Sequence, residues 1–347
     1  MSTGEIYALT AKEATTPAID PWNNVVQEDL APFIQFHGLQ PTDEIHGLLD
    51  NEKLRPLAKS AVSGIGLTDD VIGFLQNKPS SVVAISGFDT AGDLHFGNLL
   101  VLKQLMILGQ KGCQVRIPLA DLEAIAARGE DSKTSEDRAN STMIPNLVQL
   151  GFKAESVYIR SAVPRILDMM AVVSRGTSPD KMEKLYGRAL SGPEIFSLTF
   201  MAADLLRPQT EGVKHTIAVY GIDEAPHIKA INQIAIDVGL KPIAGLFSPL
   251  VPSKQNSSIK MSKSLQKRGA NLSLTAAVED ARDTIIQYEV QDPCMVKSLR
   301  KHFLIGSVLR DDALECDREC AACRRESGAA IFGFMANKNL IQKLANL

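Results

Sequence analysis

The chain has 347 residues, a 45% hydrophobic fraction and a net charge of −3. These values suit one large α/β domain with a smaller appendage and a full hydrophobic core. They exclude a strongly basic protein, so any contact with RNA would require a local basic patch.

The sequence pattern also argues against membrane and secretory classes. No apolar run approaches the roughly 20 residues that a membrane span needs. The first residues, MSTGE, lack the basic start and apolar stretch of a signal peptide. Five cysteines, an odd number, argue against a disulfide framework. We therefore expect a cytoplasmic protein with no membrane partner.

The first third of the chain predicts an α/β fold. Residues 1–80 are expected to form a mainly helical N-terminal region, which includes a helix capped by Asp69. An apolar strand at about 81–86, a helix at about 96–108 and a strand at 115–119 follow in order. This βαβ spacing predicts the opening of a Rossmann-like, doubly wound parallel sheet.

The remaining elements extend this domain. The catalytic domain is expected at 81–270, with a helical insertion at about 125–205. A buried strand at 215–220 ends in a glycine, and its helix begins near Pro226, a residue that suits a first helical turn. Residues 271–347 have a helical pattern and predict a short C-terminal helical domain.

The first chemical motif is HFGN at residues 95–98, after the first strand and a turn with two glycines. The start of a helix offers N–H groups and a positive dipole end to phosphate. His95 and Asn98 would donate to phosphate oxygens, while Gly87 and Gly97 would let a nucleotide approach the backbone. A histidine at a helix start, taken alone, is more often a surface or capping residue.

The second chemical motif is KMSKS, a Ser-containing loop in which Lys260 and Lys263 are three residues apart. Two mobile lysines suit a polyphosphate. Adenylation of a carboxylate builds negative charge on the α-phosphorus and on the leaving pyrophosphate. The catalysts it needs are therefore cations and hydrogen-bond donors, and no protein nucleophile. The other residues of the loop are expected to contact the nucleotide: Met261, Ser262 and Ser264.

A third polar group, Gly221 and Asp223, follows the strand at 215–220. An acidic residue just beyond a parallel strand commonly accepts hydrogen bonds from ribose hydroxyls. Asp223 is therefore expected to hold the ribose of a nucleotide. The alternative is that Asp223 caps the next helix, and the two roles are compatible.

HFGN and KMSKS, in this order and local context, resemble the HIGH and KMSKS signatures of class I aminoacyl-tRNA synthetases. Further segments resemble the archaeal and eukaryotic tryptophanyl branch of that family. They are Pro21-Trp22, the LADLEA segment at 119–124, GIDEAP at 221–226 and CAACR at 320–324. The tyrosyl branch shares the same core and is the second candidate.

The resemblance implies a Rossmann domain split by a helical insertion, followed by a helical domain that reads the anticodon. It implies a homodimer that uses ATP and Mg²⁺ to activate tryptophan and transfer it to tRNA. It places the amino acid beside Ile85, Glu123, Met201 and Glu224. Three of these depart from the family pattern, since glutamines are replaced by Met201 and Glu224 and a tyrosine by Ile85. The match is closer for adenylate chemistry than for amino-acid selection.

Three alternatives to a tryptophan–tRNA ligase stay open. They are a tyrosine–tRNA ligase, a paralogue that passes a different activated amino acid to another acceptor, and a non-catalytic regulator with the same fold. The intact lysine pair disfavours the regulator. Cys316, Cys320 and Cys323 are close enough in sequence to ligate zinc, but a structural zinc site needs four ligands. We expect no metal bound to the protein there.

Overall fold

The computed structural model describes residues 26, 29–262, 271–274, 277–289, 294–300 and 320–335. Its helices are α1 (Ala31–His37), α2 (Arg55–Ser60), α3 (Asp69–Asn77), α4 (Phe96–Gln110), α5 (Asp121–Arg128), α6 (Ser132–Arg138), α7 (Ile144–Gln149), α8 (Ile166–Ser174), α9 (Pro179–Tyr186), α10 (Gly192–Thr210), α11 (Ala225–Asp237), α12 (Val278–Ile286), α13 (Met295–Leu299) and α14 (Cys320–Met335). Its strands are β1 (Gln40–Pro41), β2 (Ser63–Ile65), β3 (Val82–Ile85), β4 (Phe88–Asp89), β5 (Gln114–Ala120), β6 (Val157–Ile159), β7 (His215–Gly221) and β8 (Ala244–Ser248). Short 3₁₀ turns include η5 (Arg160–Ala162) and η6 (Ile222–Glu224).

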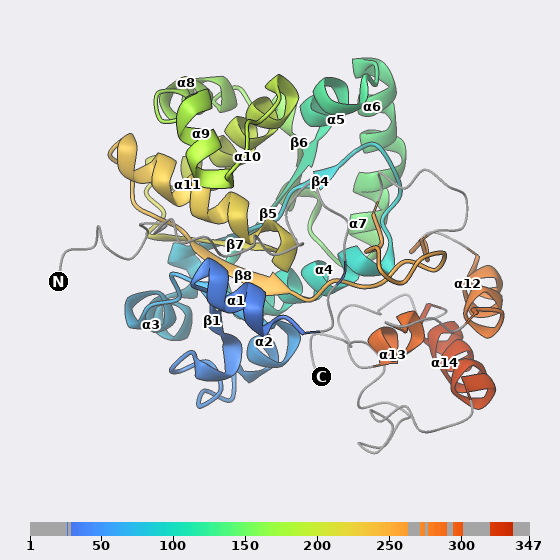
Figure 1. The fold of residues 1–347 in the computed structure, drawn as a ribbon. Coiled ribbons are helices and arrows are strands. Elements are labelled where there is room, and N and C mark those ends of the chain that lie inside the picture. Colours follow the sequence, from blue (N-terminus) through green and yellow to red (C-terminus); the bar gives the residue numbers. More distant parts are fainter. Residues whose placement is uncertain are drawn as a thin grey trace.

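The strands form one mixed sheet with helices around it (Figure 1). The strand order is β1-β2-β8-β7-β3-β5-β4, and β6 pairs with β5 beside this path. Pairings among β3 to β8 are parallel, whereas β2 pairs antiparallel with both β1 and β8. The predicted fold class, a mostly parallel Rossmann-like sheet with flanking helices, is confirmed. Strand β2 also belongs to this sheet, although it lies within residues 1–80, the region that the sequence pattern predicted to be mainly helical.

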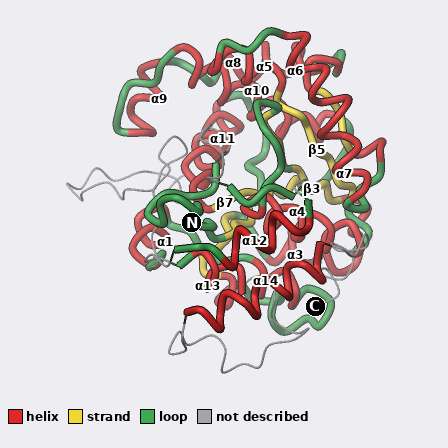
Figure 2. The backbone as a smooth tube through the Cα atoms, turned by 90° about the vertical axis from the view of Figure 1, so that its right-hand side faces the viewer, coloured by secondary structure: helices red, strands yellow, loops and turns green. Residues whose placement is uncertain are grey.

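Strand β3 divides the core between the two faces of the sheet. Val82 and Ala84 belong to a core that includes α4, whereas Val83 and Ile85 belong to a second core that includes α10 and α11. The division follows from the strand itself, because successive side chains point to opposite faces. Figure 2 shows the strands lying between helices. Both faces of the central strands are therefore covered.

The helices expected from the sequence occur close to their predicted positions, with one change at a cap. The first well-patterned helix, α3, begins at Asp69, but Thr68 is its cap and accepts a hydrogen bond from the Val71 N–H at 3.5 Å. The insertion between β5 and β7 contains α5 to α10. Helices α12, α13 and α14 lie together at one side of the molecule (Figure 1). Ile285 and Ile331 connect this group to the α4 core.

Within the ranges that the structure describes, no helix is both long enough and apolar enough to cross a membrane.

Candidate functional site

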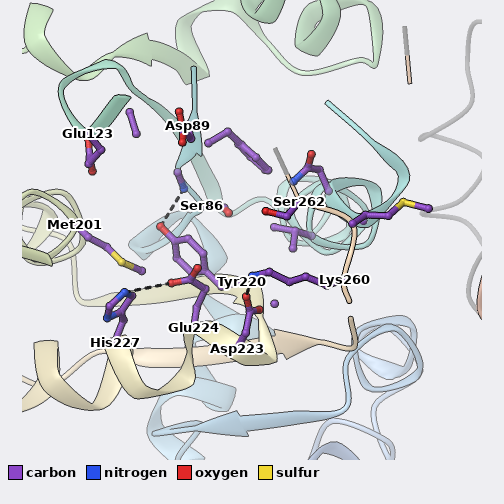
Figure 3. A pocket seen from close by; sticks show the side chains of 18 of the residues that line it. Ser86, Asp89, Glu123, Met201, Tyr220, Asp223, Glu224, His227, Lys260 and Ser262 are labelled. Carbon is purple, nitrogen blue, oxygen red and sulfur yellow. Dashed lines mark hydrogen bonds and ion pairs between the residues drawn. The ribbon is translucent and has the colours of Figure 1, made fainter. Parts of the chain in front are cut away.

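A cavity of about 510 Å³ lies beyond the carboxyl ends of β3 and β7. This volume is in the range of small-molecule and cofactor sites, and ligands of open α/β sheets bind at this edge. Figure 3 shows the cavity with side chains converging from several elements. The cavity is lined by many of the residues predicted from the sequence: Gly87, His95, Gly97, Asn98, Glu123, Met201, Gly221, Asp223, Glu224, Lys260, Met261 and Ser262.

Three predicted site residues are not placed in this cavity. Ile85 is completely buried and does not line it. The reason is its register on β3, which directs Ile85 into the core with α10 and α11, while the following Ser86 and Gly87 reach the cavity. Placing Ile85 at the amino-acid pocket is a prediction that this geometry does not support. Lys263 and Ser264 lie outside the described residues.

The HFGN segment is held by a network around the start of α4. His95 is the N-cap of the helix and is only 4% exposed. The Asn98 Oδ1 accepts a hydrogen bond from the His95 N–H at 3.1 Å, which leaves the Asn98 NH₂ as the donor toward the cavity. The Phe96 N–H donates to the Leu272 carbonyl at 3.0 Å. Two of the backbone N–H groups at the start of α4 are therefore already hydrogen-bonded within the protein.

Gly97 lies where the two signature segments pack together. A Cβ on Gly97 would lie 3.0 Å from the His95 ring and 3.4 Å from the Met261 Cβ. The sequence interpretation gave this glycine the task of admitting a nucleotide. The contacts add a second reason, because a Cβ here would press on the His95 ring and touch the Met261 side chain.

The KMSKS loop is fixed on both sides of its described part. The Met261 N–H donates to the Val251 carbonyl at 2.7 Å. The Asn271 amide accepts from the Ser262 N–H at 3.2 Å and donates to the Ser262 carbonyl at 2.9 Å. Asn271 was not predicted as a site residue. A single polar residue after a motif loop gives no indication in the sequence that it will hydrogen-bond the loop. Asn271 closes the loop by holding its two ends together.

Lys260 forms a close ion pair with Asp223, and both side chains are largely buried. Asp223 lies in η6 and is not a helix cap, because the N-cap of α11 is Glu224. A Cβ on Gly221 would collide with the Asp223 carboxylate, so a larger residue here would displace that side chain. A ribose bound to Asp223 would share that carboxylate with Lys260.

The other end of the cavity contains a buried ionic cluster. Arg160, from η5, has a side chain that is 2% exposed and pairs with both Glu123 of α5 and Asp204 of α10. The distance from Arg160 Nε to Asp204 Oδ2 is 2.5 Å. Figure 3 shows Glu123 and Met201 on the side of the cavity opposite Lys260 and Ser262. Arg160 was missed in the sequence, where the available signal was its position directly after the short strand β6.

Tyr220 and Gly87 join the two ends of the cavity. The Gly87 N–H donates to the Tyr220 Oη at 2.9 Å. Burial raises the pKa of Tyr220, so its hydroxyl stays protonated. Tyr220 was read only as part of a strand, yet its hydroxyl fixes the turn that follows β3.

Glu224 and His227 are neutralised by their surroundings. Burial and the neighbouring Asp223 raise the pKa of Glu224 to about 8, against the opposing effect of Lys260. Burial lowers the pKa of His227 to about 3, so its imidazole is uncharged at neutral pH. The Tyr186 hydroxyl lies 2.5 Å from His227 Nδ1, and His227 Nε2 lies 3.8 Å from Glu224.

The cysteines proposed as zinc ligands are only partly within the described residues. The Cys323 sulfur accepts a hydrogen bond from Arg300 at 3.0 Å, and Cys316 lies outside the described residues. Across the ranges that the structure covers, no three His, Cys, Asp or Glu side chains are grouped to hold a metal ion.

Comparison with known proteins places this architecture in a family. Residues 77–304 match the family described as class I tRNA synthetases (W and Y). The tryptophan–tRNA ligase of Methanocaldococcus jannaschii is 26% identical over 226 residues, which cover 62% of this chain and 60% of that protein. The enzyme of that name from Methanopyrus kandleri is 25% identical over 346 residues and is covered over 90% of both chains.

Among solved structures, the tryptophanyl-tRNA synthetase of Aeropyrum pernix K1 has the same fold. Its TM-score is 0.75 at 20% identity, with coverage of 92% of this chain and 95% of that chain. The match to the Methanocaldococcus relative spans about three fifths of that relative's length. From the matched residues, which include both signature segments and the whole described cavity, the chain belongs to the W and Y family of class I tRNA synthetases.

Proposed function

We propose that the protein is a tryptophan–tRNA ligase. It would activate tryptophan with ATP as the aminoacyl-adenylate, release pyrophosphate and transfer the amino acid to tRNA. One observation carries the proposal: the HFGN and KMSKS segments line one cavity at the carboxyl ends of parallel strands. The ligases of Methanocaldococcus jannaschii and Methanopyrus kandleri supply the choice of amino acid.

ATP would lie at the end of the cavity formed by His95, Asn98, Asp223 and Lys260. Asn98 has its NH₂ group available for a phosphate oxygen, because its carbonyl oxygen is held by the backbone. Lys260 is a buried cation that would exchange part of its pairing with Asp223 for phosphate. These donors act where negative charge develops, which is how electrostatic stabilisation lowers an activation barrier.

Tryptophan would lie at the opposite end, against Met201 and the cluster of Glu123 and Arg160. The thioether of Met201 suits the face of an aromatic ring. Glu224 lies between the two ends, and its raised pKa keeps its carboxyl protonated at neutral pH, so it would contribute a hydrogen bond and no charge to the substrate.

Mg²⁺ fits the proposal as a companion of ATP. Magnesium commonly binds one or two carboxylates together with substrate phosphates, in place of an all-protein cage. Asp223, which lines the cavity and pairs with Lys260, is the carboxylate that would contribute, and the ion would neutralise phosphate charge there.

The test of the first half-reaction is ATP–pyrophosphate exchange with each of the twenty standard amino acids. Tryptophan should give the highest rate. Tyrosine as the preferred substrate would replace the proposal with a tyrosine–tRNA ligase. No exchange with any of the twenty would favour a paralogue with another substrate or a non-catalytic regulator.

The test of the second half-reaction is charging of total tRNA with labelled tryptophan. Charging should be seen, and exchange without charging would indicate a different acceptor. The expected homodimer stays a prediction from the family resemblance, and the cytoplasmic location stays a prediction from the sequence pattern. Sedimentation of the purified chain, with and without tRNA, measures the first of them.

A further inference from the structure

A short stretch after the KMSKS loop, residues 271–274, connects the two signature segments and is called the link segment below. The Phe96 N–H donates to the Leu272 carbonyl at 3.0 Å, and the Leu274 N–H donates to the Leu94 carbonyl at 2.9 Å. The residues between these two bonds form an antiparallel bridge. The link segment is therefore attached by its backbone to the start of the HFGN helix.

Asn271, the first residue of the link segment, holds the KMSKS loop with its side chain. The Asn271 Oδ1 accepts from the Ser262 N–H at 3.2 Å, and the Asn271 Nδ2 donates to the Ser262 carbonyl at 2.9 Å. One planar amide thus engages both backbone groups of a single residue, which fixes its direction as well as its distance. We call this arrangement a two-bond contact.

Ser262 occupies the position in the loop where such a contact has the most consequence. It lines the cavity, and the preceding Met261 N–H donates to the Val251 carbonyl at 2.7 Å. The Ser262 carbonyl belongs to the planar peptide unit that joins Ser262 to Lys263. Asn271 therefore orients the peptide unit from which the chain continues into the second lysine of the motif.

The same two-bond contact also occurs in two places away from the cavity. Asn232 of α11 donates to the Ile243 carbonyl at 3.0 Å and accepts from the Ile243 N–H at 2.7 Å. Gln209 of α10 donates to the Lys241 carbonyl at 2.7 Å and accepts from the Lys241 N–H at 2.9 Å. Both contacts attach a helix to the segment that leads into β8. Asn271 makes this contact beside the cavity, between the two signature segments.

We propose that Asn271 is a positioning residue for the reaction. It holds the KMSKS lysines at a set place relative to His95 and Asn98, because the link segment is attached to both signatures. Asn271 does not line the cavity, so it acts on the reaction through Lys263. This inference rests on the proposed activation of an amino acid with ATP. A displacement of about 1 Å in a group that meets developing charge costs about 100-fold in rate.

The variant Asn271→Ala removes both hydrogen bonds and leaves the backbone of the link segment in place. In ATP–pyrophosphate exchange, normalised by active-site titration, kcat should fall by about 30-fold. The KM for tryptophan should stay within about twofold, because the amino-acid end of the cavity is not attached to the link segment. An unchanged kcat, or a rise in KM for tryptophan that accounts for the whole loss, overturns the proposal.

A double-mutant cycle with Lys263→Ala tests whether Asn271 acts through that lysine. In a chain that already carries Lys263→Ala, the second change Asn271→Ala should lower kcat by less than about threefold. Effects of independent residues multiply instead. A further loss of about 30-fold in the double variant therefore overturns the proposal.

Gln209→Ala is the matched control, because it removes a two-bond contact of the same kind from a half-buried residue away from the cavity. Its kcat per active site should stay within about twofold of the wild type. A loss as large as that of Asn271→Ala would show that such contacts affect the rate only through general stability, which contradicts a positioning role.

Hydrogen exchange separates a local effect from a general loss of structure. The Ser262 N–H should exchange at least about tenfold faster in Asn271→Ala than in the wild type. The Ile243 N–H, which Asn232 holds, should keep its wild-type rate. Equal acceleration at both amides would assign Asn271 to the stability of the whole chain and overturn the proposal.

Failure of this inference is distinguishable from failure of the proposed function. If the wild type catalyses no exchange with any amino acid, the proposed activity fails and the positioning role falls with it, while hydrogen exchange at Ser262 still reports the contact. If the wild type is active and Asn271→Ala keeps its kcat, the activity stands and the role of Asn271 is wrong.

Discussion

The two ends of the cavity are built in different ways. The nucleotide end is held by backbone hydrogen bonds between separate segments, such as Phe96 with Leu272 and Met261 with Val251, together with one ion pair between Lys260 and Asp223. The amino-acid end depends on charged side chains that are almost completely buried, with Arg160 between its two carboxylates. Figure 3 shows the labelled residues of the two ends facing each other.

The departures from the family pattern, Ile85, Met201 and Glu224, were all predicted for the amino-acid pocket, but none of them is a member of the charged cluster. A change in one member of that cluster alone is costly, because it leaves a buried charge without its partner.

The largest expected effect comes from breaking the cluster. Arg160→Met leaves two buried carboxylates without their cation and should reduce the free energy of unfolding by about 3–5 kcal/mol. Urea unfolding measures the loss. Arg188→Met, which removes a partly exposed pair with Glu194, should cost less than about 1 kcal/mol. Equal losses would show that the buried cluster contributes no more to the free energy of unfolding than a partly exposed ion pair does.

Substitution of a lysine at the nucleotide end should lower the catalytic rate and leave the stability of the protein unchanged. Lys263→Ala should lower kcat by about 100-fold or more with a modest change in the KM for ATP, because the lysine acts on the charge of the transition state. Steady-state exchange kinetics measure both constants. Lys254, in the same loop but outside the cavity lining, supplies the control Lys254→Ala. A large rise in KM with unchanged kcat would assign Lys263 to ground-state binding instead.

A smaller effect is expected where the two signature segments touch. Gly97→Ala places a methyl group against His95 and Met261 and should lower kcat/KM for ATP by about tenfold through displacement of these residues. Gly73→Ala is the matched control, since nothing lies within 4 Å of the new Cβ in helix α3. If both variants are equally active, the contact between the segments is not part of the site's geometry.

The smallest effect on activity is expected at Glu224. Glu224→Gln should keep tryptophan activation within about tenfold, because the native carboxyl is already protonated below pH 8. A substrate with a cationic side chain would lose far more, since breaking a buried charge pair costs about 3–5 kcal/mol. Exchange rates at pH 7 with tryptophan and lysine separate these outcomes.

Glu224 should also give a pH dependence of stability. Its pKa rises from an ordinary 4.5 to about 8 on folding, with Asp223, Lys260 and His227 facing it. The folded state therefore binds a proton that the unfolded state releases, and this contribution is full below about pH 4.5 and is lost as the pH rises through 8. The Tm of the wild type should fall relative to that of Glu224→Gln between pH 5 and pH 9. Parallel curves would contradict the shift.

Much of the site was predictable because its signals are local. The apolar run of β3, the glycine turn and the HFGN helix start act within a few residues of one another, and the same is true of the strand that ends at Gly221. The prediction for Ile85 failed for a different reason. A strand buried on both faces has no polar alternation, so nothing in its sequence tells which side faces a ligand.

The sequence by itself determined three strands of the parallel sheet, the helix that follows the first of them and the two segments that line the nucleotide end. Short-range patterns of polarity and glycine suffice for these features. Only the tertiary structure decided that Arg160 meets Glu123 and Asp204, since they come from a turn and two separate helices. No local pattern marks such a meeting, because each side chain gains its ionic partner only when the sheet and the insertion have packed together.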